Sequence, residues 1–290
     1  MKQSAIATAR IGMVNYLNLA PIYEKWKESA FPESWQLVEA PPSELNKKLC
    51  DGDIDLGFVS SFEYGAHPDK YKILSGLSIS ANGSVGSVFL FSHVPMEQLD
   101  TLPVLLSSQS ETSVGLLKII LGQFLKVQPV YSTGDVSEFD EKKFKAVLAI
   151  GDDALRLLEK SRFLYQFDLG DIWKRETGLP FVFAVCAARE DFCETHPELV
   201  GEIHKELLRC SAEGKSDLAS ICTVAAPRIP MSEKRCHDYL SAIEYDLGGK
   251  KQKALETFFN YLIKCKEADP ACLPLKLYSN LYEAPSSSST

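Results

Sequence analysis

Short apolar runs alternate with amphipathic segments over the first sixty residues, and this alternation constrains the fold more than any other feature of the chain. Runs of strand length lie at 10–14, 35–39 and 54–59. The segments between them carry apolar side chains at helical spacing, with Pro21 in a first helical turn and Gly52 at a helix end. Strand–helix–strand alternation predicts an α/β lobe built on a mainly parallel sheet.

A second group of predicted strands and helices follows the first. The apolar runs that predict strands are 84–92, 104–106, 146–150 and 181–187. Helices are expected after the second and the third of these runs, and the region 197–266 is expected to be mostly helical.

Two of the extended segments, near 89–92 and near 183–186, could both cross between lobes. Such a pair of crossings makes the middle of the chain an inserted lobe and leaves a ligand cleft between the two lobes. The expected division is a first lobe of 1–91 plus 186–284, an inserted lobe of 92–185 and a disordered tail of 285–290.

The net charge and the hydropathy of the chain exclude several classes of partner. Asp and Glu total 39 against 31 Lys and Arg, a formal charge of −8. Wrapping nucleic acid requires clustered basic residues, so no nucleic acid partner is expected, although a local pocket can still bind a small anion. No apolar run approaches the roughly 18 to 20 residues that span a bilayer. Residues 1–10 lack the apolar core of a secretory signal, and no membrane partner is expected.

The cysteines and histidines lack the spacing of a metal site. They are Cys50, Cys186, Cys193, Cys210, Cys222, Cys236, Cys265 and Cys272, with His67, His93, His196, His204 and His237. None of the cysteines forms a C-x-x-C pair, and their spacings match no common zinc pattern. Scattered cysteines in a chain of this length are typical of reduced thiols in the cytosol. We therefore expect a cytoplasmic protein with no bound metal.

The loop at 107–113 joins a predicted strand to a predicted helix and is rich in hydroxyl groups. The N-terminus of a helix offers unpaired N–H groups and a partial positive charge, which suit a carboxylate or a phosphate. Ser110, Thr112 and Ser113 could add hydroxyl donors to such a site. Plain capping of the helix is the alternative, and Glu111 argues against an anion unless it points to solvent.

Other polar residues follow predicted strands at the ends where α/β lobes bind their ligands. Asn18, the pair Ser60 and Ser61, and Asp152 occupy such positions, and capping of the next helix is the alternative role for Asn18 and for Asp152. Ser87 lies on an apolar run between two glycines, where its hydroxyl needs either a ligand or neighbouring backbone as a partner. Phosphate-loop, dinucleotide-binding and nucleophile-elbow motifs are absent, and no acid–base pair stands out.

Seven collinear motifs carry a resemblance to a known family. They are IGMVNYLN (11–18), GDIDLG (52–57), LSIS (77–80), SETS (110–113), IGDDAL (150–155), YQFDLG (165–170) and TGLPFVFA (177–184). In this order they resemble the chorismate dehydratases of the futalosine route to menaquinone. The resemblance runs from about Arg10 to about Ala187 and is diffuse beyond Glu190.

The resemblance implies a two-lobed fold like that of type II periplasmic binding proteins, with a ligand cleft between the lobes. It implies a cytosolic carbon–oxygen lyase that removes water from chorismate to give 3-[(1-carboxyvinyl)oxy]benzoate, with no metal or organic cofactor. Asn18 and Ser87 stand at positions that match substrate contacts of the family, and we expect them to be catalytic. The loop with Ser110, Thr112 and Ser113 matches the probable carboxylate-binding loop of the family.

The chemistry of this substrate suits the residue types of the predicted site. Chorismate is a dianion, so helix N-termini and hydroxyl groups can bind it without a basic surface. Loss of the ring hydroxyl and of the adjacent ring proton creates a benzene ring, which drives the reaction. Because no acid–base pair stands out, we hypothesise that the side-chain carboxylate of the substrate itself takes the proton.

Three other functions stay open on the sequence. A non-enzymatic solute-binding protein for a small carboxylate is the usual role of this architecture. The related enzyme that releases dihydroxynaphthoate later in the same route has a Ser-Pro-Cys-Pro-Asn-type motif, whereas this chain reads VNYLN at 14–18. A regulatory ligand-sensing domain is the third, but no helix-turn-helix segment is recognisable.

Overall fold

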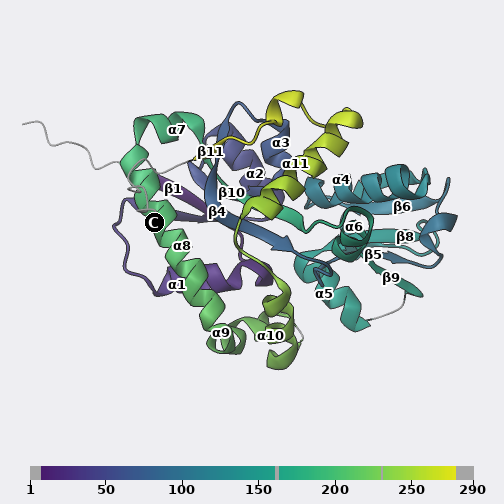
Figure 1. Cartoon of the computed structure of the whole chain (residues 1–290). Helices are drawn as coiled ribbons and strands as arrows, with labels where there is room; N and C mark the ends of the chain where they lie inside the picture. Colours follow the sequence, from purple (N-terminus) through teal and green to yellow (C-terminus); the bar gives the residue numbers. More distant parts are fainter. Residues whose placement is uncertain (1–7, 161–162, 230, 279–290) are drawn as a thin grey trace, which may run out of the picture.

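Two α/β lobes, each built on one β-sheet, form the molecule (Figure 1). The computed structural model describes residues 8–160, 163–229 and 231–278, so the predicted tail at 285–290 lies outside the described residues. The first sheet has the order β11-β4-β10-β3-β1-β2, formed by β1 (Ala9–Met13), β2 (Trp35–Glu39), β3 (Leu56–Ser60), β4 (Tyr71–Ala81), β10 (Phe181–Arg189) and β11 (Leu277–Tyr278). The second has the order β7-β6-β8-β5-β9, formed by β5 (Val88–Ser92), β6 (Pro103–Ser107), β7 (Val130–Gly134), β8 (Ala146–Ile150) and β9 (Tyr165–Asp168).

Helices cover both sheets, and most of the C-terminal third is helical, as predicted. The α-helices are α1 (Ala20–Glu28), α2 (Pro42–Asp51), α3 (Ser61–Ala66), α4 (Glu111–Ile119), α5 (Gly151–Lys160), α6 (Leu169–Thr177), α7 (Glu190–Thr195), α8 (Pro197–Ser216), α9 (Leu218–Ala225), α10 (Glu233–Ala242) and α11 (Gly249–Lys264). The short turns are η1 (Leu17–Leu19), η2 (Met96–Gln98), η4 (Val136–Glu138), η5 (Ala226–Arg228) and η6 (Pro270–Cys272), with a π-helical turn η3 (Ile120–Leu125). None of the described helices is long and apolar enough to cross a bilayer.

Among the described strands both sheets are mainly parallel, as predicted, but each contains one antiparallel strand, β10 in the first sheet and β5 in the second. In the first sheet, β1 runs parallel to β2 and to β3, as strand–helix–strand units require. The strand β10 is antiparallel to both of its long neighbours, β3 and β4. In the second sheet, β5 is antiparallel to β8 and β9. These antiparallel strands are the ones that the chain enters from the other lobe, so their direction is not set by a local strand–helix–strand unit.

The strand predicted at 84–92 begins only at Val88. Gly83 and Gly86 adopt positive φ angles of 126° and 72°, so the chain turns before it can enter the sheet. The predicted runs at 104–106, 146–150 and 181–187 lie in β6, β8 and β10 and are confirmed as strands.

The pairing of the strands indicates where the boundaries between the two lobes lie. All the pairing of β5 is with the second sheet, and all the pairing of β10 is with the first. The predicted boundaries at 91/92 and 185/186 fall inside these two strands. We propose boundaries a few residues earlier, between β4 and β5 and between α6 and β10. Helix α11 lies across the junction, against β10 and α4 (Figure 1).

Candidate functional site

A cavity of about 650 Å³, counted out to its open mouth, lies between the two lobes. Its polar lining groups are Tyr16, Asn18, Ser60, Ser87, Ser110 and Ser113. The remaining lining residues, of which Phe58, Ile79 and Phe183 are examples, are apolar or glycine. Within the described part of the chain, no carboxylate, imidazole, ammonium or guanidinium group lines the cavity.

The structure places five of the eight predicted site residues in this wall and three behind it. Those in the wall are Asn18, Ser60, Ser87, Ser110 and Ser113, and those behind it are Ser61, Thr112 and Asp152. The hydrogen bonds of each residue explain the division.

Asn18 lies in η1, directly after β1, and its backbone carbonyl accepts a hydrogen bond from the Tyr245 hydroxyl at 2.8 Å. The predicted alternative, capping of α1, is not seen, because the N-cap of α1 is Leu19 and makes no side-chain cap. The Oδ1 atom of Asn18 is buried and has no hydrogen-bond partner in the described structure. Buried polar atoms are nearly always paired, so an unpaired amide oxygen on a cavity wall indicates a ligand with a donor group.

Ser87 is 2% exposed, and its hydroxyl oxygen accepts a hydrogen bond from the hydroxyl of Tyr239, on α10, at 2.8 Å. Burial raises the pKa of Tyr239 above its ordinary value, so this phenol stays protonated and acts as the donor. The Ser87 carbonyl accepts from the N–H of Gly151 at 2.7 Å, which fixes the backbone. The proton of the Ser87 hydroxyl is therefore left to donate to a ligand in the cavity.

The N-terminus of α4 forms another part of the wall. Ser110 caps this helix, accepting from the Ser113 N–H at 3.2 Å and donating to the Ser113 hydroxyl at 3.0 Å. Capping and cavity lining thus occur together here. Thr112 instead accepts from the Phe62 N–H at 2.8 Å, which joins α4 to α3. Glu111 is exposed, which meets the condition under which an anion can bind at this helix end.

Ser60 lies in the cavity wall and Ser61 lies behind it, because the two adjacent side chains point in different directions. Ser60 caps α3 through the Glu63 N–H at 3.1 Å, and the side-chain amide of Asn46 bonds both its hydroxyl and its N–H, each at 3.0 Å. Ser61 is fully buried and donates to the Val182 carbonyl at 2.7 Å. Its hydroxyl joins β3–α3 to β10 and is not free for a ligand.

Two contacts connect the lobes at the edge of the cavity. The Asp152 carboxylate accepts from the Leu17 N–H at 3.3 Å, and the Tyr16 hydroxyl donates to the side-chain oxygen of Gln109. Burial, with the nearby acidic residues, raises the pKa of Tyr16 to about 12, so its hydroxyl stays protonated. Gly151 has φ +54°, and a Cβ there would lie 2.9 Å from the Tyr16 ring. A side chain at this position would push the contact apart.

Three helices begin at the cavity wall: α3 after Ser60, α4 after Ser110 and α5 at Gly151. Each helix start brings a partial positive charge to the wall, although the Phe62 and Glu63 N–H groups of α3 already donate to Thr112 and Ser60. The cavity therefore suits a ligand with anionic groups and an apolar body. Sequence reasoning missed Tyr16, Gln109, Tyr239 and Tyr245. Tyr16 and Gln109 lie in segments that were singled out, 11–18 and 107–113, whereas the other two tyrosines do not.

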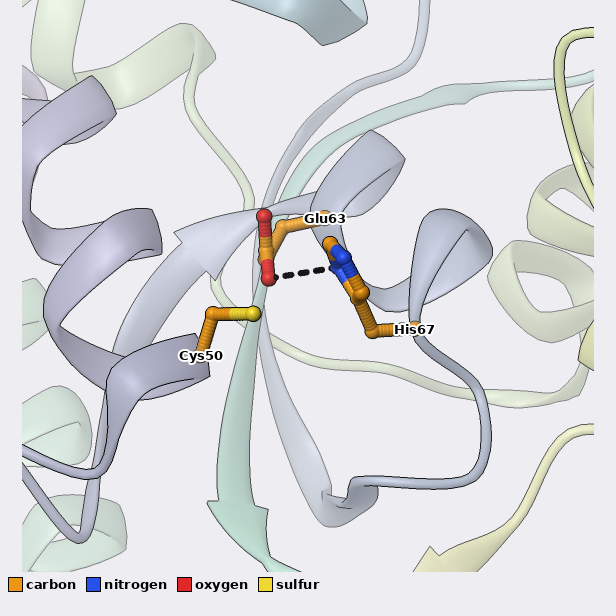
Figure 2. A group of neighbouring side chains, drawn as sticks. All are labelled: Cys50, Glu63 and His67. Carbon is orange, nitrogen blue, oxygen red and sulfur yellow. Dashed lines mark ion pairs between the residues drawn. The ribbon is translucent and has the colours of Figure 1, made fainter.

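Away from the cavity, Cys50, Glu63 and His67 bring their potential ligand atoms within 4.8 Å of one another (Figure 2). This convergence departs from the expectation that the cysteines and histidines lack ligand spacing. None of the three side chains lines the cavity between the lobes.

Comparisons with known proteins agree with this architecture. Residues 9–264 match a family model described as menaquinone biosynthesis. The chain is 30% identical over 263 residues to the chorismate dehydratase of Thermus thermophilus, an alignment that covers 86% of this chain and 93% of the relative. It is also 30% identical over 177 residues to the chorismate dehydratase of Campylobacter jejuni, covering 60% and 64%.

Solved structures share the fold at low sequence identity. Protein AF1704 from Archaeoglobus fulgidus superposes with a TM-score of 0.66 at 16% identity, covering 89% of this chain and 98% of that chain. The periplasmic aliphatic sulphonate binding protein SsuA from Escherichia coli gives a TM-score of 0.64 at 14% identity, covering 94% and 92%. These neighbours confirm the predicted periplasmic-binding-protein-like fold.

Proposed function

The chain belongs to the menaquinone biosynthesis family, and from this premise we infer that it removes one molecule of water from chorismate. The product is 3-[(1-carboxyvinyl)oxy]benzoate, so the protein is a carbon–oxygen lyase that acts early in the futalosine route to menaquinone. The relative from Thermus thermophilus, which is named for this reaction, aligns over 86% of the chain and therefore across both lobes.

The observation that best supports this function is a cavity lined by hydroxyl and amide groups at three helix starts, without a charged side chain among the described lining residues. A dianion with an apolar ring matches such a wall. One carboxylate of chorismate is proposed to lie at the N-terminus of α4, against Ser110 and Ser113. The ring then lies against apolar residues that include Phe58 and Phe183.

We propose that Asn18 and Ser87 bind the leaving group, which is the ring hydroxyl of chorismate. The ring hydroxyl of chorismate is both a donor and an acceptor. It can donate to the unpaired Oδ1 of Asn18 and accept from the Ser87 hydroxyl, whose own oxygen is already bonded to Tyr239. Ser60 is proposed as a further substrate contact, whereas Ser61, Thr112 and Asp152 act behind the wall. Holding the substrate in one conformer can supply roughly 7 to 11 kcal/mol of the barrier.

In the proposed reaction, the ring C–H bond and the C–O bond to the ring hydroxyl both break. The proton passes to the side-chain carboxylate of the substrate and then leaves with the hydroxyl as water, so no oxidant or external base is consumed. The wall supports this route, because Tyr16 is the one titratable side chain among its described residues. With a pKa of about 12, Tyr16 is not a base at neutral pH.

Asp152→Asn tests for a protein base near the cavity. The amide oxygen can still accept from the Leu17 N–H, so we expect kcat to stay within about threefold of wild type, whereas losing a general base costs roughly 10² to 10⁴. Burial raises the pKa of Asp152, so its ionised form is disfavoured in the folded state and the variant should be no less stable at pH 7. Steady-state kinetics and thermal unfolding measure both. A hundredfold fall in kcat with unchanged substrate binding would assign the base to Asp152.

The reaction itself is tested with purified protein and chorismate. The ultraviolet spectrum is expected to change from that of a cyclohexadiene to that of a benzoate, and mass spectrometry should show the loss of one water. Binding of chorismate by calorimetry without any turnover would instead favour the alternative of a solute-binding protein. Intact, unbound chorismate would contradict both.

We also propose a cytoplasmic location, on the evidence of the thiols. All eight cysteines are free and six of them are buried. Burial raises the pKa of Cys210 to about 12, and burial likewise raises the pKa of Cys186 and Cys236. Buried thiols with raised pKa values stay protonated and unreactive, and a large set of free thiols is typical of a reducing compartment.

A further inference from the structure

The joint between α2 and α3 carries three side chains of the types that bind transition metals (Figure 2). Cys50 lies in the last turn of α2, Glu63 lies on α3, and His67 follows α3 directly. In Figure 2 the sulfur and the imidazole ring both point toward the Glu63 carboxylate. We propose that Cys50, Glu63 and His67 bind a Zn²⁺ ion, at a site separate from the cavity between the lobes.

The first argument is the burial of Glu63, which is 4% exposed. A buried carboxylate is costly unless it is paired or bound to a metal. The Tyr71 hydroxyl donates to its Oε1 atom at 2.6 Å, and the Nδ1 atom of His67 lies 2.9 Å from the same oxygen. A ligating carboxylate is normally held by a further hydrogen bond of this kind, and here Tyr71 supplies it.

The second argument is independent and concerns the His67 ring. Its Nδ1 atom is buried and has no hydrogen-bond partner in the described structure. The Glu63 oxygen is close, at 2.9 Å, but it does not lie in the direction of a hydrogen bond from the ring. An unpaired buried ring nitrogen that faces a carboxylate and a thiol is suited to a metal ion, since neutral imidazole is a common metal ligand.

The third argument concerns access and geometry at Cys50. Cys50 lines a surface hollow together with Lys70 and Arg189, and this hollow gives an ion and a water ligand an approach to the residue. Zn²⁺ accepts sulfur, nitrogen and oxygen ligands in a tetrahedron whose ligand atoms lie about 3.3 to 3.6 Å apart. The atoms of this cluster span 2.9 Å to within 4.8 Å. Small side-chain rotations would complete three protein ligands, and water would fill the fourth position.

The side chain of Lys70 provides a further test of the zinc site, because it contacts the Cys50 sulfur. Its ammonium group lies 3.0 Å from the Cys50 sulfur and 3.2 Å from the Cys50 carbonyl. This positive charge competes with a cation for the sulfur, but the side chain is exposed and can swing away. Removing the Lys70 ammonium should therefore strengthen zinc binding, a result that a purely structural Cys50–Lys70 contact does not predict.

The test is a zinc titration of untagged, metal-free protein against a chromophoric chelator, with no chorismate present. One equivalent of Zn²⁺ is expected to bind. Cys50→Ser and His67→Ala should each weaken binding at least tenfold, and Lys70→Ala should tighten it severalfold. The matched control is Cys265→Ser, because Cys265 is an exposed thiol away from the cluster, and it should bind zinc like wild type.

Two further measurements distinguish a variant that has lost a metal ligand from a variant that has lost its fold. Cobalt substitution should give the thiolate charge-transfer band of a Co²⁺–sulfur bond in wild type and in Cys265→Ser, but not in Cys50→Ser. Circular dichroism should show the same helical signal for all variants. Less than one equivalent of zinc on wild type, or wild-type affinity in Cys50→Ser, would overturn the site. A thiolate band that is lost in Cys265→Ser would do the same.

Discussion

Asn18→Ala is expected to lower kcat/KM for chorismate by about a hundredfold, because a misplaced leaving group can cost about 10² in rate. The Oδ1 atom of Asn18 is buried without a protein partner, so the substrate hydroxyl is its proposed partner. The same fact predicts that folding is unaffected: no hydrogen bond within the protein is lost, and the free energy of unfolding should stay within about 0.5 kcal/mol of wild type. Steady-state kinetics and urea unfolding measure the two quantities.

Asn46→Ala is the matched control for this variant. The amide of Asn46 is also buried, but both of its polar atoms bond Ser60 at 3.0 Å. Its removal leaves buried groups unpaired and should cost about 1 to 3 kcal/mol of stability. Asn18 is thus expected to act on activity, whereas Asn46 is expected to act on stability. Wild-type kcat/KM in Asn18→Ala would refute the assigned role, and so would a loss of stability equal to that of Asn46→Ala.

Ser87→Ala is expected to have the largest effect, a fall in kcat/KM of about 10² to 10³, as when one positioned donor is removed from a reacting oxygen. This variant should also lose about 1 to 3 kcal/mol of stability, because the buried Tyr239 hydroxyl then has no acceptor. The Tyr239 hydroxyl donates its proton to Ser87 at 2.8 Å, so we expect it to orient the serine and not to contact the substrate. Tyr239→Phe should therefore lower kcat/KM by no more than about tenfold.

The double variant Ser87→Ala with Tyr239→Phe gives this pair a sharp test. Removing both hydroxyl groups leaves no orphaned donor, so stability should return toward wild type. Activity should stay as low as in Ser87→Ala alone, since the tyrosine acts through the serine. A larger activity loss in Tyr239→Phe than in Ser87→Ala would instead place the phenol against the substrate.

The periodic parts of the fold could be predicted from the sequence, and the parts built from distant partners could not. Local spacing located β6, β8 and β10, because their apolar runs are continuous. The strand β4 gave no such signal, since serines and a glycine interrupt it. The Ser78 and Ser80 hydroxyls bond carbonyls of Asp246 and Glu244, 168 and 164 residues away. No local pattern records partners at that distance.

The candidate site likewise contains residues that the sequence predicted and residues that it could not predict. A polar residue at the carboxyl end of a strand was a sound guide to Asn18, Ser60 and Ser110, all of which line the cavity. The rule could not distinguish Ser60 from Ser61, because the hydroxyl proton of Ser61 is donated to the Val182 carbonyl, a partner that only the folded chain brings near. The Cys50–Glu63–His67 cluster was missed because zinc patterns are searched as short cysteine and histidine spacings. Here a glutamate supplies one ligand, and the cysteine comes from another helix.

The support of Asn18 and Ser87 by Tyr245 and Tyr239 has a consequence for biosynthesis. The two tyrosines stand 227 and 152 residues after the groups they contact, so the inserted lobe leaves the ribosome before the Ser87 hydroxyl and the Asn18 backbone carbonyl receive these hydrogen bonds. A nascent chain that has already paired most of its strands therefore still lacks the two hydrogen bonds that hold these groups. We therefore expect full activity only after the C-terminal segment that carries Tyr239 and Tyr245 has packed against the rest of the chain.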